Sequence, residues 1–140
     1  KIPEEELNHI DIAEGCKALT DVGVRVNLGA HGQLAGLGPH WELWMFEQGG
    51  MTPMEALCAA TLNGAIYVGL DKDVGSIQAG KLADFLVLDQ NPLENIRNSE
   101  TIRYTVLNGR VYDAHTMNEL GNHPRQRAPF YFERDASERY

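Results

Sequence analysis

The chain has 140 residues, 43% of them hydrophobic and 23% charged, a composition that supports a core of normal size and argues against disorder. Its 20 acidic residues against 12 basic residues give a formal net charge of −8, which disfavours nucleic-acid backbones and anionic membrane surfaces as partners. No apolar run approaches the ~20 residues that a membrane helix needs. We therefore expect a soluble, acidic protein without nucleic-acid or membrane partners.

An α-helix is expected over residues 4–20, where apolar side chains recur at spacings near 3.6 and acidic residues gather in the first turn. Residues 21–23 end this helix, and the β-branched run at residues 24–28 predicts a strand. A helix followed by a strand is the rhythm of a parallel α/β sheet or barrel. Four glycines interrupt residues 29–38, and α/β barrels hold their chemistry in the loops that follow strands. Any active-site residue is therefore expected in this loop.

Two further helices follow. The first starts at Pro39 and is apolar on most sides, which predicts packing between neighbours. The second has Thr52 as N-cap, Pro53 at its first position and Glu55 to close a capping box. Asn and Gly at residues 63–64 are expected to break it, leaving a second helical piece over residues 65–69.

After Gly80 the apolar period changes to 2, which is typical of strands. Residues 85–88 predict a strand buried on both faces, and residues 103–112 predict a hairpin that turns at Asn108 and Gly109. Residues 95–101 form a polar connection with room for one helical turn. The tail from Gly121 has no core-forming period except at residues 129–132 and is expected to be extended or loose.

Cys16 and Cys58 lie far apart, each in a helical apolar pattern, so we interpret both as small hydrophobic residues rather than as a disulfide or a redox pair. This usage fits a reducing compartment. The compartment itself is unknown, with the cytoplasm slightly favoured.

His31 is the candidate catalytic residue, because it follows the predicted strand within the glycine-rich loop, where little except function requires an imidazole. A loop histidine bonded to backbone is the alternative. Gln33 and His40 flank the same loop and could line a substrate pocket, although polar residues in such places are as often merely solvated. Trp41 and Trp44, at helical spacing, are expected to pack in the core rather than to bind substrate.

Three segments carry a resemblance to a known family: residues 28–41 (LGAHGQLAGLGPHW), 51–70 (MTPMEALCAATLNGAIYVGL) and 75–89 (GSIQAGKLADFLVLD). Together they resemble the C-terminal end of a metal-dependent amidohydrolase of the branch that includes imidazolonepropionase-like and Xaa-Pro dipeptidase-like enzymes. The resemblance runs from about residue 24 to about residue 120. Full enzymes of that family are several times longer, so the chain is expected to be a fragment.

The resemblance implies an α/β fold in three parts. Residues 1–70 would supply the last strand and helices of a (β/α)8 TIM-like barrel, residues 71–120 would form part of a small composite β-sandwich domain, and residues 121–140 would be an extended tail. In this family the loop after the last barrel strand usually presents an Asp that contacts the metal and takes a proton from the attacking water. His31 stands in the place of that Asp, and an imidazole can also bind a metal or act as a base.

The chain lacks the ligands for a complete metal site, since it has no H-x-H, H-E-x-x-H or Cys/His pairing. The family's ligands, a His-x-His pair, a bridging Lys or Glu and two more histidines, would lie upstream of residue 1. We therefore expect a divalent metal, zinc first of all, in the full-length enzyme and none in this fragment, which would be inactive by itself.

Two functional hypotheses remain. The first is a hydrolase that cleaves amide, cyclic amide or dipeptide C–N bonds of a small substrate by metal-activated water. The second is a non-catalytic binding or assembly module. In the second hypothesis a partner chain would cover the exposed helix faces. Isolated barrel helices leave apolar faces bare, so we expect self-association or packing on the missing barrel. A His-x-His pair in the upstream reading frame would decide for the enzyme.

Overall fold

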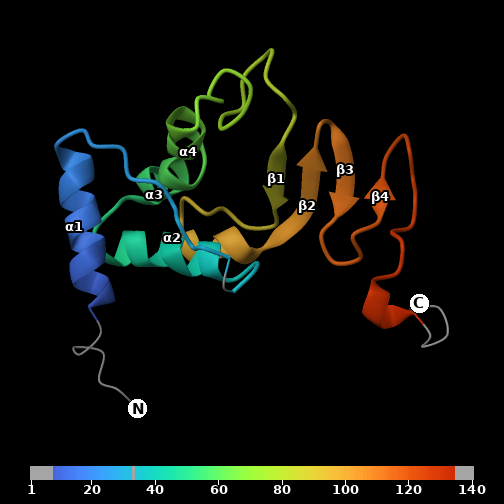
Figure 1. Ribbon diagram of the computed structural model, residues 1–140, viewed down its shortest axis with the longest axis horizontal. Coiled ribbons are helices and arrows are strands. Elements are labelled where there is room, and N and C mark those ends of the chain that lie inside the picture. Colours follow the sequence, from blue (N-terminus) through green and yellow to red (C-terminus); the bar gives the residue numbers. More distant parts are fainter. Residues whose placement is uncertain (1–7, 33, 135–140) are drawn as a thin grey trace. The chain divides into compact units, whose positions relative to one another are not determined.

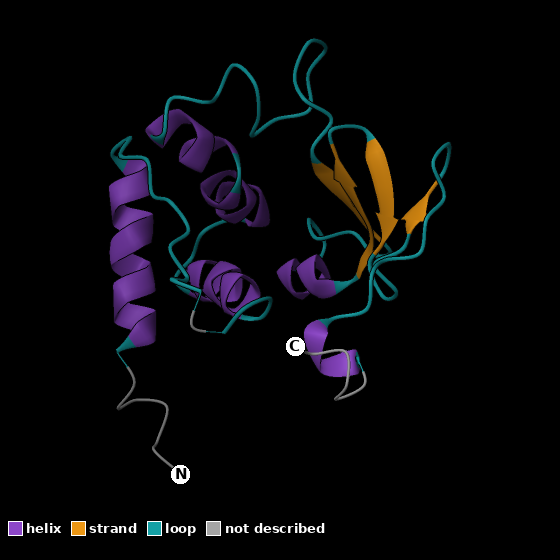
Figure 2. Ribbon diagram, turned by 45° about the vertical axis from the view of Figure 1, so that its right-hand side comes forward, coloured by secondary structure: helices purple, strands orange, loops and turns teal. Residues whose placement is uncertain are grey.

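The structure, a computed structural model, describes residues 8–32 and 34–134 of the chain. Its elements in chain order are α1 (His9–Asp21), α2 (Gly38–Gln48), α3 (Pro53–Ala60), α4 (Leu62–Tyr67), β1 (Phe85–Leu88), the 3-10 helix η2 (Ile96–Glu100), β2 (Ile102–Leu107), β3 (Arg110–Asp113), β4 (Glu119–Leu120) and the 3-10 helix η3 (Tyr131–Glu133) (Figure 1). The described chain forms two compact units. One consists of the chain up to Leu82 with Leu88–Thr101 and contains the α-helices; the other consists of Ala83–Val87 with the chain from Ile102 onward and contains nearly all of the sheet (Figure 2).

The helical unit is organised around α2, which packs against α1, α3 and η2. Its core consists of Leu43, Phe46, Met51, Ala56, Ala59 and Ile96. Leu43 and Phe46, both on α2, are 6% and 5% exposed. Burial of each such large side chain contributes about 1.5–3 kcal/mol relative to leaving it in water. The packing of α2 against its neighbours therefore contributes substantially to the stability of this unit.

The predicted first helix is confirmed as α1, which ends at Asp21; residues 4–7 of the prediction lie outside the described residues. At the C-terminal end of α2, Gly49 lies directly against α1. A Cβ added at Gly49 would sit 2.3 Å from the carbonyl carbon of Ala13, which is 2% exposed. Gly49 has an ordinary φ of −81°, so its requirement for glycine is steric.

Residues 24–28 do not form the predicted strand. A strand exists through backbone pairing, and no strand among the described residues pairs with this segment. The backbone of this segment forms hydrogen bonds with helical residues instead. The Leu28 N–H donates to the Ala59 carbonyl at 3.1 Å, and Asn63 Nδ2 donates to the Val26 carbonyl at 2.9 Å. Val26 and Leu28 still pack against the helical core, so the apolar pattern correctly indicated a buried side.

The capping box of α3 is confirmed, because the Glu55 N–H donates to Thr52 Oγ1 at 3.2 Å and the Thr52 N–H donates to Glu55 Oε2 at 2.7 Å. The break between α3 and α4 comes at Thr61 and not at residues 63–64. Thr61 leaves the helical region with φ −130°, and its hydroxyl donates to the Leu57 carbonyl at 2.7 Å. This side-chain bond satisfies a carbonyl at the end of α3, which allows the helix to stop there.

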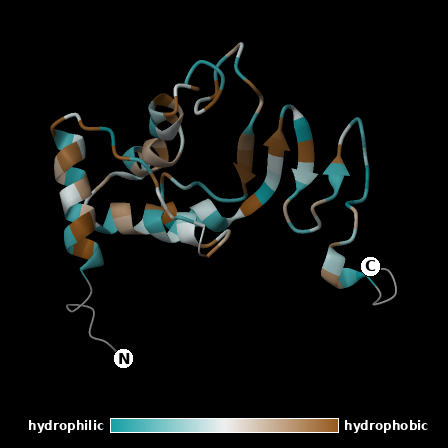
Figure 3. Ribbon diagram, viewed as in Figure 1, coloured by the Kyte–Doolittle hydropathy of each residue, from teal (hydrophilic) through white to brown (hydrophobic). Residues whose placement is uncertain are grey.

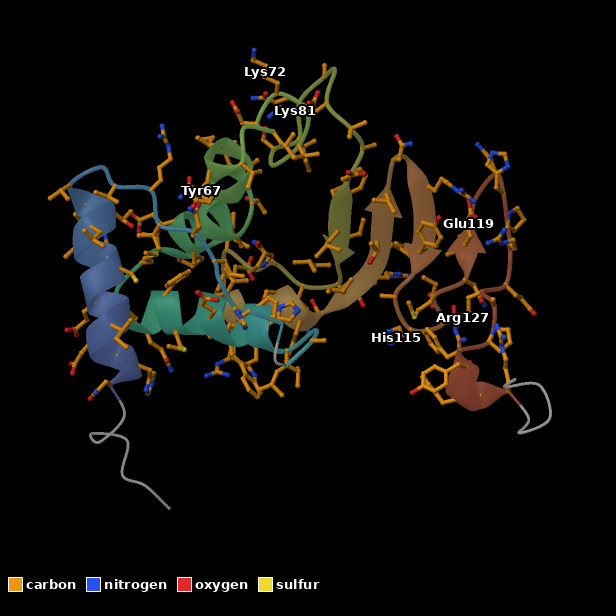
Figure 4. All side chains as sticks on the ribbon, in the orientation of Figure 1. Tyr67, Lys72, Lys81, His115, Glu119 and Arg127 are labelled. Carbon is orange, nitrogen blue, oxygen red and sulfur yellow. The ribbon has the colours of Figure 1, made fainter. Side chains whose placement is uncertain are left out.

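Lys81 ties together the loop that follows α4 (Figure 4). Its ammonium group donates to Ser76 Oγ at 2.6 Å, to the Val74 carbonyl at 3.3 Å and to the Asp71 carbonyl. An ammonium group has three donors, and here each has an oxygen partner. The loop is therefore held by a side chain within it rather than by regular secondary structure.

The sheet has the order β1-β2-β3-β4. Its predicted hairpin is confirmed: β2 pairs antiparallel with β3 up to the pair Leu107↔Arg110. Asn108 and Gly109 in the turn have φ values of +49° and +77°. A type I′ turn requires positive φ at both positions, which is why this dipeptide favours it.

The prediction that residues 85–88 are buried on both faces is wrong. Phe85, Leu86 and Val87 are 37%, 51% and 37% exposed, although β1 is the most apolar strand of the sheet (Figure 3). β1 is an edge strand, and the described residues of its unit contain one sheet and a single short 3-10 helix, η3. The apolar composition of the strand therefore indicated a buried environment that these residues do not supply.

Strand β4 was not predicted from the sequence; it pairs with β3 through Val111↔Leu120 and Tyr112↔Glu119. The side chain of Glu119 is 4% exposed and accepts from the guanidinium of Arg110, which holds the pKa of Glu119 below its usual value. Beyond Gly121 the described tail is mostly irregular, as predicted, but it is anchored (Figure 4). Arg127 donates to both carboxylate oxygens of Glu133 at 2.6 Å.

None of the described helices combines the length and the apolar composition needed to cross a membrane.

The first prediction concerns the contact between α1 and the end of α2. Gly49→Ala should lower the free energy of unfolding by about 2–3 kcal/mol, because the new methyl group overlaps Ala13 and the helices must separate. Gly15→Ala is the matched control, since a Cβ there meets no atom within 4 Å, and it should raise stability by about 0.5–1 kcal/mol. Urea denaturation of the three proteins would measure both changes. Equal stability of Gly49→Ala and the parent would contradict the steric argument.

The second prediction concerns the tail at low pH. The hydrogen bonds from Arg127 and from the Phe130 N–H lower the pKa of Glu133 from 4.5 to about 2. Because the folded pKa is the lower one, the contribution of this carboxylate to tail stability should be present above pH 4.5 and lost as the pH falls through about 2. A carbon-13 NMR titration of the Glu133 carboxyl group should show this value, rising toward 4.5 in Arg127→Ala and staying low in the control Arg125→Ala. A midpoint near 4.5 in the parent would refute the assignment.

Candidate active site

The glycine-rich loop starts at Gly29, whose backbone N–H is held by Glu42 on α2. Both carboxylate oxygens of Glu42 lie 3.0 Å from the Gly29 nitrogen. At the other end of the loop, the Gly38 N–H donates to the Leu34 carbonyl at 2.8 Å. Gly38 also lies close to Ala30, since an added Cβ would sit 3.4 Å from the Ala30 Cβ. The loop therefore leaves and rejoins the molecule at the first turns of one helix.

His31 lies within this loop, is exposed and has φ +53°, followed by Gly32 with φ +71°. A positive φ is uncommon for residues other than glycine and costs of the order of 1 kcal/mol. Such conformations cluster at binding and catalytic sites, where surrounding contacts maintain them. The candidate catalytic residue thus has an unusual backbone conformation and an accessible imidazole.

His40 lies in the first turn of α2 and is half-buried. Its Nδ1 lies 3.0 Å from Ser99 Oγ, and Trp44 Nε1 donates to the same oxygen at 3.3 Å. Ser99, in η2, is 5% exposed. His40 therefore links α2 to η2, and no hydrogen bond between the described residues joins it to His31. Gln33, the other predicted substrate-binding residue, lies outside the described residues.

The two tryptophans differ in their surroundings. Trp44 packs against the core as predicted, and the Arg97 guanidinium lies 4.5 Å from the centre of its ring. Trp41 is 43% exposed, so its predicted core position is wrong. The face of α2 that packs in the core carries Leu43 and Phe46, and Trp41 does not lie on that face.

The described residues do not fit a metal centre. They contain no group of three or more His, Cys, Asp or Glu side chains placed to hold a metal ion. Cys16 and Cys58 are free thiols and partly buried. What this region offers chemically is one exposed imidazole on a short loop, anchored by a carboxylate.

Sequence reasoning missed the roles of two residues. Glu42 was not among the predicted site residues, although an acidic residue one turn after a glycine-rich loop is placed to accept backbone N–H groups of that loop. Ser99 carried no signal, because its partner His40 lies 59 residues away in the sequence. Contacts over such separations depend on how α2 and η2 pack.

A family model for the amidohydrolases matches residues 4–112 of the chain. The chain belongs to the amidohydrolase family. The predicted resemblance to this family is confirmed, and the mixed helix and sheet content of the described residues agrees with membership of a TIM-barrel family.

Curated relatives match over short segments. Imidazolonepropionase of Symbiobacterium thermophilum is 51% identical over 39 residues, which cover 28% of this chain and 9% of that protein. Ochratoxinase of Aspergillus niger is 46% identical over 52 residues, which cover 36% of this chain and 11% of that protein. The matched segment thus spans about a tenth of the length of these relatives.

Solved structures match over longer stretches. A Xaa-Pro dipeptidase with methionine bound in its active site is 28% identical with a TM-score of 0.67, covering 74% of this chain and 26% of that one. Molinate hydrolase is 36% identical with a TM-score of 0.59, covering 64% of this chain and 19% of that one. The arrangement of the described residues is thus similar to part of much larger hydrolases.

The third prediction concerns the buried serine. Ser99→Ala should lower the free energy of unfolding by about 1–3 kcal/mol, because it leaves Trp44 Nε1–H and His40 Nδ1 without their common partner. Trp44→Phe keeps an aromatic ring and removes the N–H, so the double variant should lose less than the sum of the two single variants. Thermal unfolding of the four proteins gives the coupling. Strict additivity would mean that the Trp44–Ser99 hydrogen bond contributes nothing.

Proposed function

We propose that the chain forms the C-terminal end of a metal-dependent amidohydrolase. In this proposal residues 1–70 complete the catalytic barrel, residues 71–120 contribute to a composite β-sandwich domain, and residues 121–140 form the tail. The family match and the similarity to a part of much larger hydrolases support it. The exposed apolar side chains of β1 also support it, because a second sheet of a sandwich would cover such a strand in the complete domain.

The proposed reaction is hydrolysis of an amide, cyclic amide or dipeptide C–N bond in a small substrate. A divalent metal, zinc first of all, would supply an activated water to the complete enzyme. Its ligands would lie outside the described residues, which contain no group able to hold it. The 140-residue chain alone is therefore expected to be inactive.

The observation that carries this proposal is the position of His31. It is an exposed imidazole in a left-handed backbone conformation, on a glycine-rich loop inside the segment that matches the family. A neutral imidazole there can take a proton from an attacking water and return it to the leaving amine. Gln33 and His40 are the proposed substrate-side residues, with His40 acting from the first turn of α2.

The alternative is a non-catalytic binding or assembly module. It is favoured by large apolar side chains that the described fold leaves in water, such as Tyr67 (80% exposed), Ile77 (85%) and Val22 (77%). Surfaces of this kind are usually covered by a partner or by another part of the same protein. In the hydrolase proposal, self-association or packing on the rest of the barrel covers them.

The fourth prediction tests the role of His31 in the intact protein. His31→Ala should reduce kcat on the best substrate of a panel of Xaa-Pro dipeptides, N-acyl amino acids and cyclic amides by roughly 10²–10⁴-fold, the usual contribution of a positioned acid–base group. His115→Ala, which removes an exposed imidazole from the sheet unit, is the matched control and should keep full activity.

Steady-state kinetics and metal analysis of the purified proteins would separate the alternatives. Unchanged turnover in His31→Ala would remove this residue from the catalytic machinery. A parent protein that holds no metal and hydrolyses none of these substrates would favour the non-catalytic module.

A further inference from the structure

Glu42 is a charged side chain that contacts the His31 loop through the Gly29 N–H, and the proposed reaction does not use it. It lies in the first turns of α2 and is partly buried. Both of its carboxylate oxygens accept from the Gly29 N–H, with N···O distances of 3.0 Å, and the two residues are 13 positions apart in the sequence. A carboxylate that accepts a backbone N–H forms a charge-assisted bond, which is stronger than the same bond to a neutral acceptor.

This bond acts at the place where the chain enters the loop. Gly29 comes directly after Leu28, whose own N–H is fixed to the Ala59 carbonyl at 3.1 Å. Two consecutive backbone N–H groups are thus bonded to two different helices, α3 through Ala59 and α2 through Glu42. His31 follows two residues later, so the position of its backbone depends on this anchor.

The exit of the loop is held at the same helix. Gly38 begins α2 and lies against Ala30, because an added Cβ would be 3.4 Å from the Ala30 Cβ and 3.6 Å from its carbonyl oxygen. The residue next to Ala30 is His31 with its positive φ. A strained residue of this kind keeps its conformation only when the surrounding structure maintains it, and here the preceding residue, Ala30, lies against the start of α2.

We propose that Glu42 is a positioning residue, which fixes the His31 loop by holding the Gly29 N–H from α2. Its catalytic consequence rests on the function proposed for His31, whereas the anchoring does not. Gly29 is exposed, so water can satisfy its N–H when Glu42 is removed. Loss of the carboxylate should therefore loosen the loop and leave the rest of the molecule intact, which distinguishes positioning from a general contribution to stability.

The experiment compares Glu42→Ala, Glu42→Gln and Glu47→Ala in the intact protein. Glu47 is an exposed glutamate on the last turn of the same helix and serves as the control. In Glu42→Ala the amide of Gly29 should exchange with solvent about tenfold faster, while the thermal midpoint stays within about 2 °C. Glu42→Gln keeps one acceptor oxygen and should be intermediate. The carbon-13 α shift of His31, which reports its φ, should move toward that of a mobile loop in Glu42→Ala, move less in Glu42→Gln and stay unchanged in Glu47→Ala.

Unchanged exchange at Gly29 and an unchanged His31 shift in Glu42→Ala would overturn the proposal. A large fall in the thermal midpoint would also overturn it, because Glu42 would then support the fold as a whole. If kcat falls in Glu42→Ala with little change in KM, positioning of His31 is supported as well. Faster exchange with full turnover would keep the anchor and contradict the proposed function of His31, so the two proposals fail separately.

Discussion

The seating of α2 is the constraint on which the helical unit depends. Leu43 and Phe46 place one side of this helix in the core, and Gly49 lets its end approach α1 to a distance that no side chain would allow. Close-packed interiors tolerate such contacts only in one arrangement, because a shift of even one methyl group is felt by all neighbours. The orientation of α2 is thereby set by apolar packing before any polar contact is considered.

Helix α2 supplies several of the contacts that hold the candidate loop, beside the bond from Leu28 to Ala59 on α3. Glu42 holds the entry of the loop, Gly38 closes its exit, and His40 and Trp44 share the hydroxyl of Ser99 in η2. None of these bonds is strong by itself, since a hydrogen bond contributes only about 0.5–1.5 kcal/mol net, and about 1.5–3 kcal/mol when one partner is charged. They are effective because the core has already placed their partners within reach.

The sheet unit follows a different rule, since charge pairs rather than a large core organise its outer part. Arg110 and Glu119 join neighbouring strands β3 and β4, and Arg127 and Glu133 fold the tail around the 3-10 helix η3. The apolar side chains of β1 stay in contact with water among the described residues. A sheet with one uncovered apolar strand is typical of a unit that packs against another layer in a larger protein, which agrees with the short spans over which the chain matches its relatives.

The sequence by itself determined the elements whose causes are local. The capping box at Thr52 and Glu55, the type I′ turn at Asn108 and Gly109, and the amidohydrolase motifs all depend on residues close together in the chain. Only the tertiary structure decided that residues 24–28 bond to helices instead of forming a strand, that β1 is exposed, and that Ser99 meets His40. These outcomes depend on which distant segment supplies a partner, and an apolar or polar pattern specifies the need for a partner without naming it.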